Sequence, residues 1–264
     1  YYLSQIVGVE SLTQSDPLKI GKYVDNVFAG KPEMDSIEEI KEDEDVSCLW
    51  LFKARSIVEA IRHYELDVPL KQYAKQREFT VNQDGMPRLH GFLDFAENDH
   101  FCELKVTSKP EIYKDKFMID DQISTYFLSN PDYTYCDMLI IKVPELKLDK
   151  NEDIYKYYER CRKDIIGRPY FYFGENFNAS KKTFGTRFYR NDFNLDDLIK
   201  KYRFICDEIK MCIERNYWMR RKSACLSPFP CDFKTVCELD GKIPENLYKH
   251  KIKKGNIVSN VMGK

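Results

Sequence analysis

Residues 88–107 read RLHGFLDFAENDHFCELKVT, two apolar-rich runs separated by a polar segment. The alternation within each run and the turn-favouring Asn-Asp pair at 98–99 predict a β-hairpin. If the turn centres on that pair, Asp94 lies opposite Glu103. Because successive side chains point to opposite faces of a strand, Glu103 and Lys105 share one face.

The facing carboxylates of Asp94 and Glu103 predict a cation site. Facing Cβ atoms in a hairpin lie about 4.5–5.5 Å apart, and two carboxylates at that distance repel each other unless a cation lies between them. Mg²⁺ or Mn²⁺ fits such a gap and would activate a water for phosphodiester hydrolysis, with Lys105 stabilising the transition state. Taken singly, each residue also fits an ordinary surface pair or turn position.

Outside the hairpin, strands and helices alternate along the chain. Strands are expected at 78–81 and 136–143, with a short helix at 119–128 before the second of them. A strand–helix–strand unit implies a parallel pair of strands with a right-handed crossover. Amphipathic helices are expected at 45–64 and 197–216. We therefore expect an α/β fold with a mixed central sheet flanked by helices.

The composition excludes several classes of protein. The chain has 264 residues, of which 43% are hydrophobic and 32% charged, as in globular proteins with a substantial core. With 43 acidic and 42 basic side chains, the chain lacks the large net positive charge of proteins that bind nucleic acids non-specifically. Any contact with nucleic acid must therefore come from local basic patches. No apolar run approaches the roughly 20 residues that span a bilayer, and no signal peptide is visible. Nine cysteines in such a chain predict reduced thiols in a cytosol.

A helical pair extends the pattern. Gln122 and Tyr126 are four residues apart and share a helix face, and an amide and a phenol suit a phosphate or a metal-bound water. The segments GFLD (91–94), ELK (103–105) and QISTY (122–126) together resemble motifs II and III and the Q-x-x-x-Y motif of PD-(D/E)XK nucleases. The similarity is to the RecB-like branch, which includes AddAB-type nuclease domains, CRISPR-associated RecB-like exonucleases and many phage nucleases.

The resemblance implies a restriction-endonuclease-like core and a set of site residues. The implied catalytic residues are Lys105, Asp94, Glu103, Gln122 and Tyr126, and the implied ligands for Mg²⁺ or Mn²⁺ are Asp94, Glu103, the Leu104 carbonyl and Asp25. In the family, the first motif is a Gly followed by a metal-binding His on an N-terminal helix. Asp25, which follows Gly21, stands at the His position. An ordinary surface acid is the alternative for Asp25.

The resemblance also implies a biological setting. The expected substrate is DNA with a single-stranded end, cut exonucleolytically, and the expected partner is a helicase or recombination protein, without a membrane. The expected location is the cytoplasm of a bacterium or phage-infected cell. We expect a single nuclease domain over 1–264, with a helical part at 1–77, a catalytic core at 78–145, a flap and C-terminal helix at 146–240, and a basic tail at 241–264.

Three cysteines, Cys225, Cys231 and Cys237, are evenly spaced near the C-terminus. They resemble the C-terminal trio of the iron–sulfur branch of the same family, in which a fourth cysteine near the N-terminus completes a [4Fe–4S] site. That cysteine normally precedes an aromatic pair like Tyr1-Tyr2, at which this sequence starts. A cluster, a zinc site and three free thiols all remain open.

Other functions compete with the nuclease. A non-catalytic DNA-binding or scaffold module could keep the same fold, a zinc-binding interaction protein could be built around the cysteines, and the substrate could be RNA. Basic side chains recur at 105–116, 181–190, 220–222 and 249–254, and aromatic side chains interleave with or adjoin the first three groups, a composition typical of single-strand binding. Surface lysines and core aromatics are the ordinary explanation for these segments.

Overall fold

The chain divides into two compact units. The computed structural model describes residues 9–11, 15–40, 49–66, 74–84, 86, 88–116, 121–217, 231, 233–239, 243–245 and 248–250. Unit 1 comprises Tyr1–Gln14, Asn82–Pro87 and Lys200–Lys264, and unit 2 comprises Ser15–Val81 and Arg88–Ile199. Where the sequence predicts one domain, the contacts thus group into two units. All residues expected in the nuclease site lie in unit 2.

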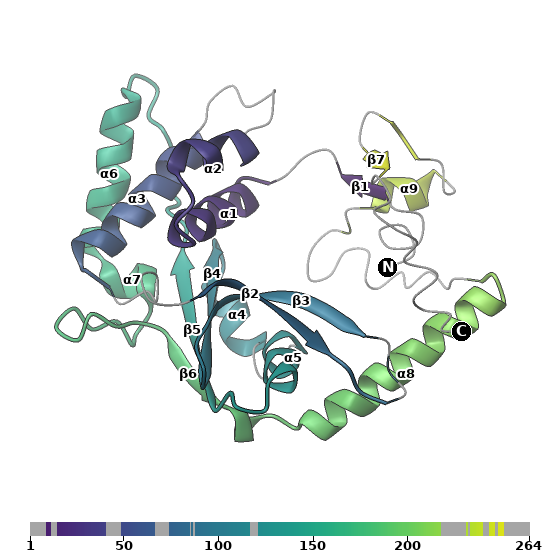
Figure 1. The fold of residues 1–264 in the computed structure, drawn as a ribbon. Helices are drawn as coiled ribbons and strands as arrows, with labels where there is room; N and C mark the ends of the chain where they lie inside the picture. The colour runs from purple at the N-terminus through teal and green to yellow at the C-terminus, as the bar shows by residue number, and fades with distance from the viewer. Residues whose placement is uncertain are drawn as a thin grey trace. The chain divides into compact units, whose positions relative to one another are not determined.

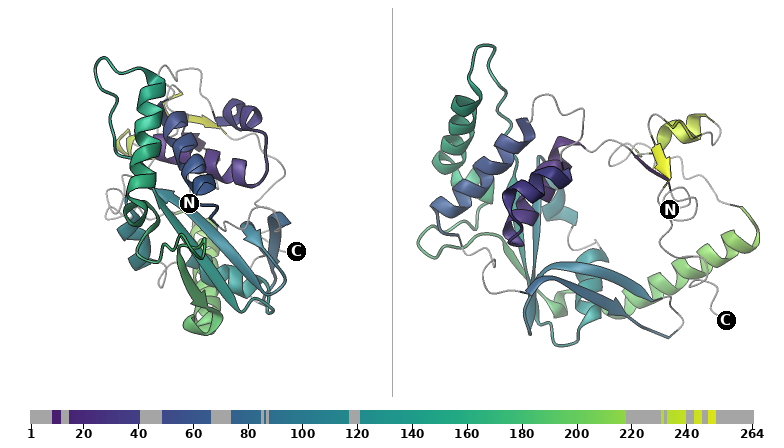
Figure 2. Two further views of the ribbon diagram at one scale, coloured as in Figure 1. Left: turned by 90° about the vertical axis from the view of Figure 1, so that its left-hand side faces the viewer. Right: turned by 45° about the horizontal axis from the view of Figure 1, so that its top comes forward.

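Unit 2 is built on a five-stranded mixed sheet. Its strands are β2 (Ala74–Val81), β3 (Leu89–Ala96), β4 (His100–Thr107), β5 (Tyr135–Lys142) and β6 (Thr186–Tyr189), in the order β2-β3-β4-β5-β6. Only the β4–β5 pair is parallel, and the other neighbouring pairs within this sheet are antiparallel. Figure 1 and Figure 2 show β2 and β3 curving away together from β5. The predicted α/β class with a mixed sheet and flanking helices is confirmed.

Helices cover both faces of this sheet. They are α1 (Asp16–Phe28), α2 (Glu33–Ile40), α3 (Leu49–His63), α4 (Pro110–Lys116), α5 (Asp121–Ser129), α6 (Ile154–Gly167) and α7 (Pro169–Phe173), with a 3₁₀ turn at Arg190–Asp192. One core joins α1 and α3 to Cys102 and Leu104 of β4, and a second joins α5 to Phe101 and Met138. In Figure 1, α1, α2, α3 and α6 gather together, apart from α5.

The hairpin has the predicted register. Phe95 pairs with Cys102 and Ala96 with Phe101, as expected for a turn centred on residues 98–99. The side chains alternate as expected, because Phe101 and Cys102 enter different cores. The parallel pairing of β4 with β5 across α4 and α5 confirms the strand–helix–strand unit.

Some elements differ from the sequence expectation. The 119–128 helix is α5, but α4 precedes it, and α6 was not predicted. Residues 167–190 lie within the expected flap region and contain α7, an isolated bridge between Asn178 and Thr183, and the edge strand β6. The five residues of α7 begin at Pro169 and end just before the positive-φ Gly174. They are too short for a helical period to stand out in the sequence.

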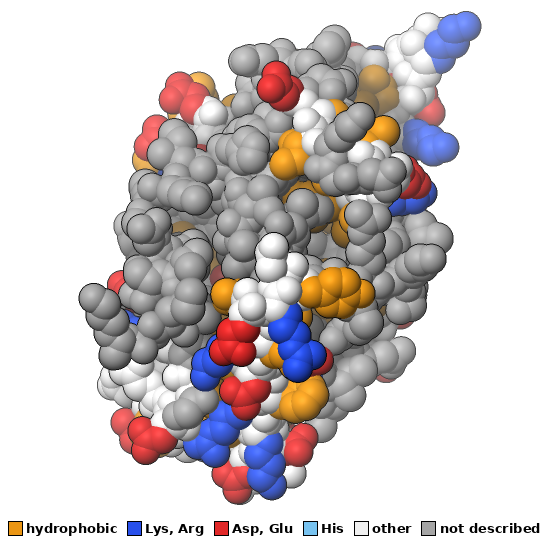
Figure 3. All heavy atoms as spheres, turned by 90° about the vertical axis from the view of Figure 1, so that its right-hand side faces the viewer, with side chains coloured by type: hydrophobic (Ala, Val, Ile, Leu, Met, Phe, Trp, Pro, Cys, Tyr) orange, Lys and Arg blue, Asp and Glu red, His pale blue; other side chains and the backbone are white. Residues whose placement is uncertain are grey.

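The described residues of unit 1 form two short strands, a short helix and most of a longer helix. Its elements are β1 (Val9–Ser11) paired antiparallel with β7 (Tyr248–His250), α9 (Lys234–Glu238), and most of α8 (Leu195–Glu214). Acidic, basic and hydrophobic side chains are interspersed on the side of the molecule that Figure 3 shows. Among the described helices, none is long and apolar enough to cross a membrane.

Candidate active site

Asp94 lies where strands β3 and β4 separate. Past the pair of Phe95 and Cys102, its Oδ2 accepts a hydrogen bond from the backbone N–H of Leu104 at 3.4 Å. The Asp94 carboxylate thus accepts the hydrogen bond that a backbone carbonyl of β3 would accept from Leu104 if the β3–β4 ladder continued. Because the N–H and C=O of one residue in an extended strand point the same way, the Leu104 carbonyl is directed toward the same gap.

Glu103 is the buried centre of the site. Its side chain is 1% exposed, and its Oε1 accepts hydrogen bonds from Lys105 Nζ and, at 2.9 Å, from Gln122 Nε2. The Gln122 amide also donates to the Tyr126 hydroxyl at 2.7 Å. Phe79 and Phe101 contact the Tyr126 ring edge-on and hold it in the core of α5. The structure therefore brings the strand motif and the helical pair together.

Helix α1 supplies the third carboxylate. Ser15 and Pro17 begin the helix, and α1 packs on β4, where a Cβ at Gly21 would lie 3.9 Å from Val106. Asp25, one turn further along, interacts electrostatically with Asp94 and Lys105. We call Asp25, Asp94, Glu103 and Lys105 the charged cluster.

Burial dominates the electrostatics of the charged cluster. It raises the pKa of Asp25 and of Glu103 to about 8, Asp94 adds to each rise, and Lys105 opposes it. Burial likewise raises the pKa of Asp94 against the opposing effect of Lys105. Burial lowers the pKa of Lys105, but Glu103, Asp94 and Asp25 together outweigh it, so the net pKa is raised. One ammonium group thus faces three carboxyl groups, of which Glu103 is buried and Asp25 and Asp94 are partly buried.

Two oxygens in the charged cluster have no hydrogen-bond partner. Among the described residues, the buried side-chain nitrogen and oxygen atoms without a partner are Asp25 Oδ1, Glu103 Oε2 and Arg55 Nε. Leaving such an oxygen buried and unpaired costs about 1–3 kcal/mol, and a carboxylate oxygen is the ligand that Mg²⁺ and Mn²⁺ prefer. The donor set therefore fits a hard divalent cation.

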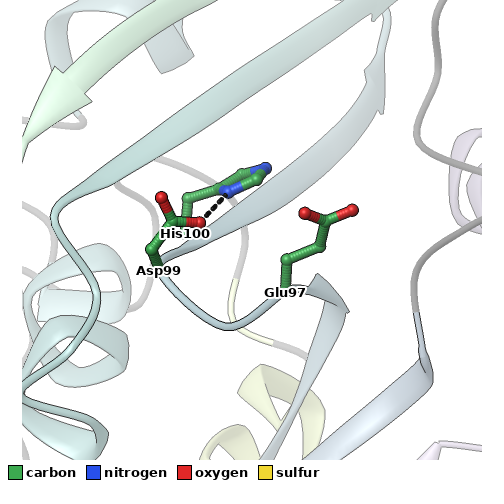
Figure 4. A group of neighbouring side chains, drawn as sticks. All are labelled: Glu97, Asp99 and His100. Atoms are coloured by element: carbon green, nitrogen blue, oxygen red, sulfur yellow. Dashed lines mark hydrogen bonds and ion pairs between the residues drawn. The ribbon is translucent and has the colours of Figure 1, made fainter.

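The β3–β4 turn carries a second group of metal-ligating side chains, which the sequence reading treated only as a turn. Glu97, Asp99 and His100 each offer a ligand atom within 4.8 Å of the others, and Figure 4 shows them around the turn. However, His100 Nδ1 is hydrogen-bonded to Asp99 at 2.8 Å, and the imidazole stacks on Tyr135. The hydrogen bond to Asp99 and the stacking on Tyr135 are therefore sufficient to explain why His100 is buried, without a metal ion.

The C-terminal cysteines lie in unit 1. Cys231 and Cys237 are partly buried and not in a disulfide, whereas Cys225 and the pair Tyr1-Tyr2 lie outside the described residues. Cluster, zinc and free thiols thus stay alternatives.

The basic segment 181–190 has structural partners. Arg187 forms a bidentate pair with Asp137 at 2.8 Å, Lys182 pairs with Glu65, and Arg190 donates to the carbonyls of Phe127, Asn130 and Tyr133. Phe184 is buried. Ion pairs, backbone contacts and core packing therefore account for most of the basic and aromatic side chains of this segment without a nucleic acid.

The predicted residues thus meet at one place. Asp94, Glu103 and Lys105 come from the hairpin, Gln122 and Tyr126 from α5, and Asp25 from α1. From the strand period alone, the first three could be placed together. Compared with known proteins, the chain matches no family model, no curated protein and no solved structure.

Proposed function

We propose that this chain is a metal-dependent deoxyribonuclease. The observation that carries the proposal is the convergence of three carboxyl groups and one ammonium group, with Asp25 Oδ1 and Glu103 Oε2 buried and unpartnered. Such oxygens, together with Asp94 and the Leu104 carbonyl, would hold Mg²⁺ or Mn²⁺.

The side chains divide the work of phosphodiester hydrolysis. A divalent ion in such a site supplies a water of lowered pKa and polarises the phosphate. Lys105 presents its ammonium group beside Glu103, where it would stabilise the negative charge that develops on the phosphate. The Gln122 amide donates hydrogen bonds to both Glu103 and the Tyr126 hydroxyl, and this pair of side chains would orient a water or a phosphate oxygen.

The fold and setting follow from the same proposal. The hairpin, the β4–β5 crossover and α1 support a restriction-endonuclease-like core of the RecB-like kind. The substrate would be DNA with a single-stranded end, cut exonucleolytically, and the partner a helicase or recombination protein. The proposed location is the cytoplasm of a bacterium or phage-infected cell.

Digestion of end-labelled single- and double-stranded DNA tests the proposal. We expect cleavage with Mg²⁺ or Mn²⁺ and none with chelator. Lys105→Ala should bind DNA but cut at least about 100-fold more slowly, as when one transition-state donor is removed. Lys150→Ala, at an exposed turn position of unit 2, is the control and should cut like wild type.

One outcome would contradict the nuclease, and another would contradict the catalytic role of Lys105. Wild-type protein that cuts with neither metal supports a non-catalytic DNA-binding module. If Lys105→Ala cuts DNA at the wild-type rate, the catalytic role assigned to Lys105 is wrong. Labelled RNA run beside the DNA decides between the two substrates.

A further inference from the structure

A cavity of about 440 Å³ is lined on one side by strand residues of the Glu103 face and on the other by α7, whose Tyr172 and Phe173 belong to the core of the opposite face. Its floor is formed by Met138 and Ile140 of β5 and by Thr186 and Phe188 of β6. The volume is within the roughly 300–1,000 Å³ range of small-molecule sites. All of the lining residues belong to unit 2.

The cavity adjoins the charged cluster through the β-ladder. Met138 is the register partner of Glu103, and Ile140 is the partner of Lys105. Register neighbours on adjacent strands point to the same face and lie about 4.8 Å apart across the ladder. The floor of the cavity is therefore the next row of side chains after the proposed catalytic ones.

Aromatic residues form one wall of the cavity. They are the residues 170–173 of α7, and Gly174, Glu175 and Asn176 continue the wall after the helix ends. The side chains of Tyr172 and Phe173 are buried in the core, and Phe171 has Lys142 and Arg168 against its ring. By contrast, Tyr170 is 63% exposed and meets Phe177 only edge-on. Tyr170 and Phe171, which is 46% exposed, are thus the α7 lining residues with aromatic surface available to a ligand, and Tyr170 has the larger exposed fraction.

The wall is held against the sheet by specific contacts. Asn176 donates to the carbonyl of Gly185 at 3.0 Å. Gly185 has φ +93°, and a Cβ there would lie 2.4 Å from the carbonyl oxygen of Met138. The segment can therefore approach β5 only with glycine at this position. Such a tied wall gives the cavity a defined shape.

The charges of the cavity favour a base over a phosphate. Glu111, in the first turn of α4, and Glu175 both line it, and carboxylates repel a phosphate. The same oxygens accept hydrogen bonds from the exocyclic amino groups of adenine, cytosine and guanine. A flat, polar-edged ring against Tyr170 thus matches this lining.

We propose that this cavity binds an unpaired base of the DNA strand, next to the phosphate held at the charged cluster. The inference rests on the proposed nuclease function and deepens it, because a base can enter the cavity only when it is unstacked and unpaired. The site would thereby select single-stranded DNA. Base stacking on an aromatic side chain tolerates any sequence, so little sequence preference is expected.

Binding measured in chelator tests the cavity without cleavage. Fluorescence anisotropy would give the Kd for a short single-stranded DNA and for the same strand with abasic sites. We expect Tyr170→Ala to weaken binding of the base-bearing strand about tenfold and leave the abasic strand unchanged. Tyr170→Phe keeps the ring and should bind like wild type. Tyr155→Ala, 71% exposed at the start of α6, is the matched control.

The outcomes separate this proposal from the nuclease proposal. Equal binding of the base-bearing strand by Tyr170→Ala and wild type would overturn the base site, and so would an equal loss for both strands. Fluorescence of 2-aminopurine placed along the strand should change on binding wild type and not Tyr170→Ala. Wild-type protein that binds in this base-dependent way but never cuts would refute the nuclease alone.

Discussion

At the scale of single residues, the charged cluster makes the stability of the protein depend on pH. The pKa values of Asp25 and Glu103 are raised to about 8 in the folded state, whereas carboxyl groups in unfolded chains titrate near 4. Between these values the folded state holds protons that the unfolded state has released. By linkage, the free energy of unfolding of the metal-free protein falls as pH rises from about 4 to about 8.

We therefore predict that the melting temperature of the chelated protein falls between pH 6 and pH 8.5. Mn²⁺ should raise it more at pH 8.5 than at pH 6, because the carboxylates must lose their protons to bind a cation. At saturating metal the rise should be about 5–10 °C. Thermal denaturation across this pH range, with and without Mn²⁺, measures both effects.

Glu103→Gln and Glu38→Gln provide the comparison. Glu103→Gln removes one of the two strongly shifted groups and should flatten the pH dependence and reduce the Mn²⁺ response. Glu38 is exposed on α2, so its replacement should change neither. A chelated wild type that is more stable at pH 8.5 than at pH 6 would contradict the prediction.

Residue-level prediction from the sequence succeeds where a short-range period controls the geometry. Asp94, Glu103 and Lys105 could be placed together because a hairpin has a fixed register and a two-residue period. Gln122 was placed on the right face of α5, but its bond to Glu103 depends on how that helix packs. Asp25 came only from the resemblance, since no local period relates α1 to the hairpin.

At the scale of elements, the approach of the 183–186 segment to β5 depends on Gly185. In Gly185→Ala the new methyl would meet the Met138 carbonyl oxygen at 2.4 Å, and the backbone would keep a positive φ of 93°. We predict that Gly185→Ala lowers the free energy of unfolding by about 1–3 kcal/mol. Urea denaturation measures it.

Gly167→Ala is the matched variant. Gly167 is the last residue of α6, and a Cβ there meets nothing within 4 Å. This change should leave stability unchanged or raise it by up to about 1 kcal/mol. If the two variants were equally stable, Gly185 would not be required for the close approach.

Elements were predictable in proportion to the strength of their periodicity. The hairpin, β5, α3 and α8 stand out because apolar residues repeat clearly in them. Helix α6 buries Tyr157, Cys161 and Ile165 at four-residue spacing, but a tyrosine and a cysteine among many charges give a weak stripe. Its start is signalled by Asp153, which caps the N–H of Tyr155, a cue that could have found it.

At the scale of the whole molecule, the division into two units could not be predicted from the sequence. The boundaries fall between Gln14 and Ser15, on either side of residues 82–87 between β2 and β3, and inside α8. The Gly and Pro within 82–87 are also what a turn between two strands requires, so they do not by themselves indicate a domain boundary. Unit 1 brings the first and last parts of the chain together through β1 and β7, a contact between residues too distant in sequence for local patterns to specify.

This division has a consequence for the two metal sites that the sequence suggested. The charged cluster belongs to unit 2, whereas Cys231 and Cys237 belong to unit 1. We predict that Cys231→Ser/Cys237→Ser keeps the Mn²⁺-induced rise in melting temperature at pH 8.5, because no ligand proposed for Mn²⁺ comes from unit 1. Thermal denaturation of the double variant beside wild type and Glu103→Gln checks this.

The comparison distinguishes local from shared metal binding. Removing two thiols of the trio would disable a four-thiolate cluster or a zinc site, so metal analysis should show less iron or zinc wherever wild type carries either. The Mn²⁺ response should nevertheless follow wild type and not Glu103→Gln. If the double variant instead lost the Mn²⁺ response while staying folded, the carboxylates of unit 2 would depend on the cysteines, and the charged cluster would not be a self-contained cation site.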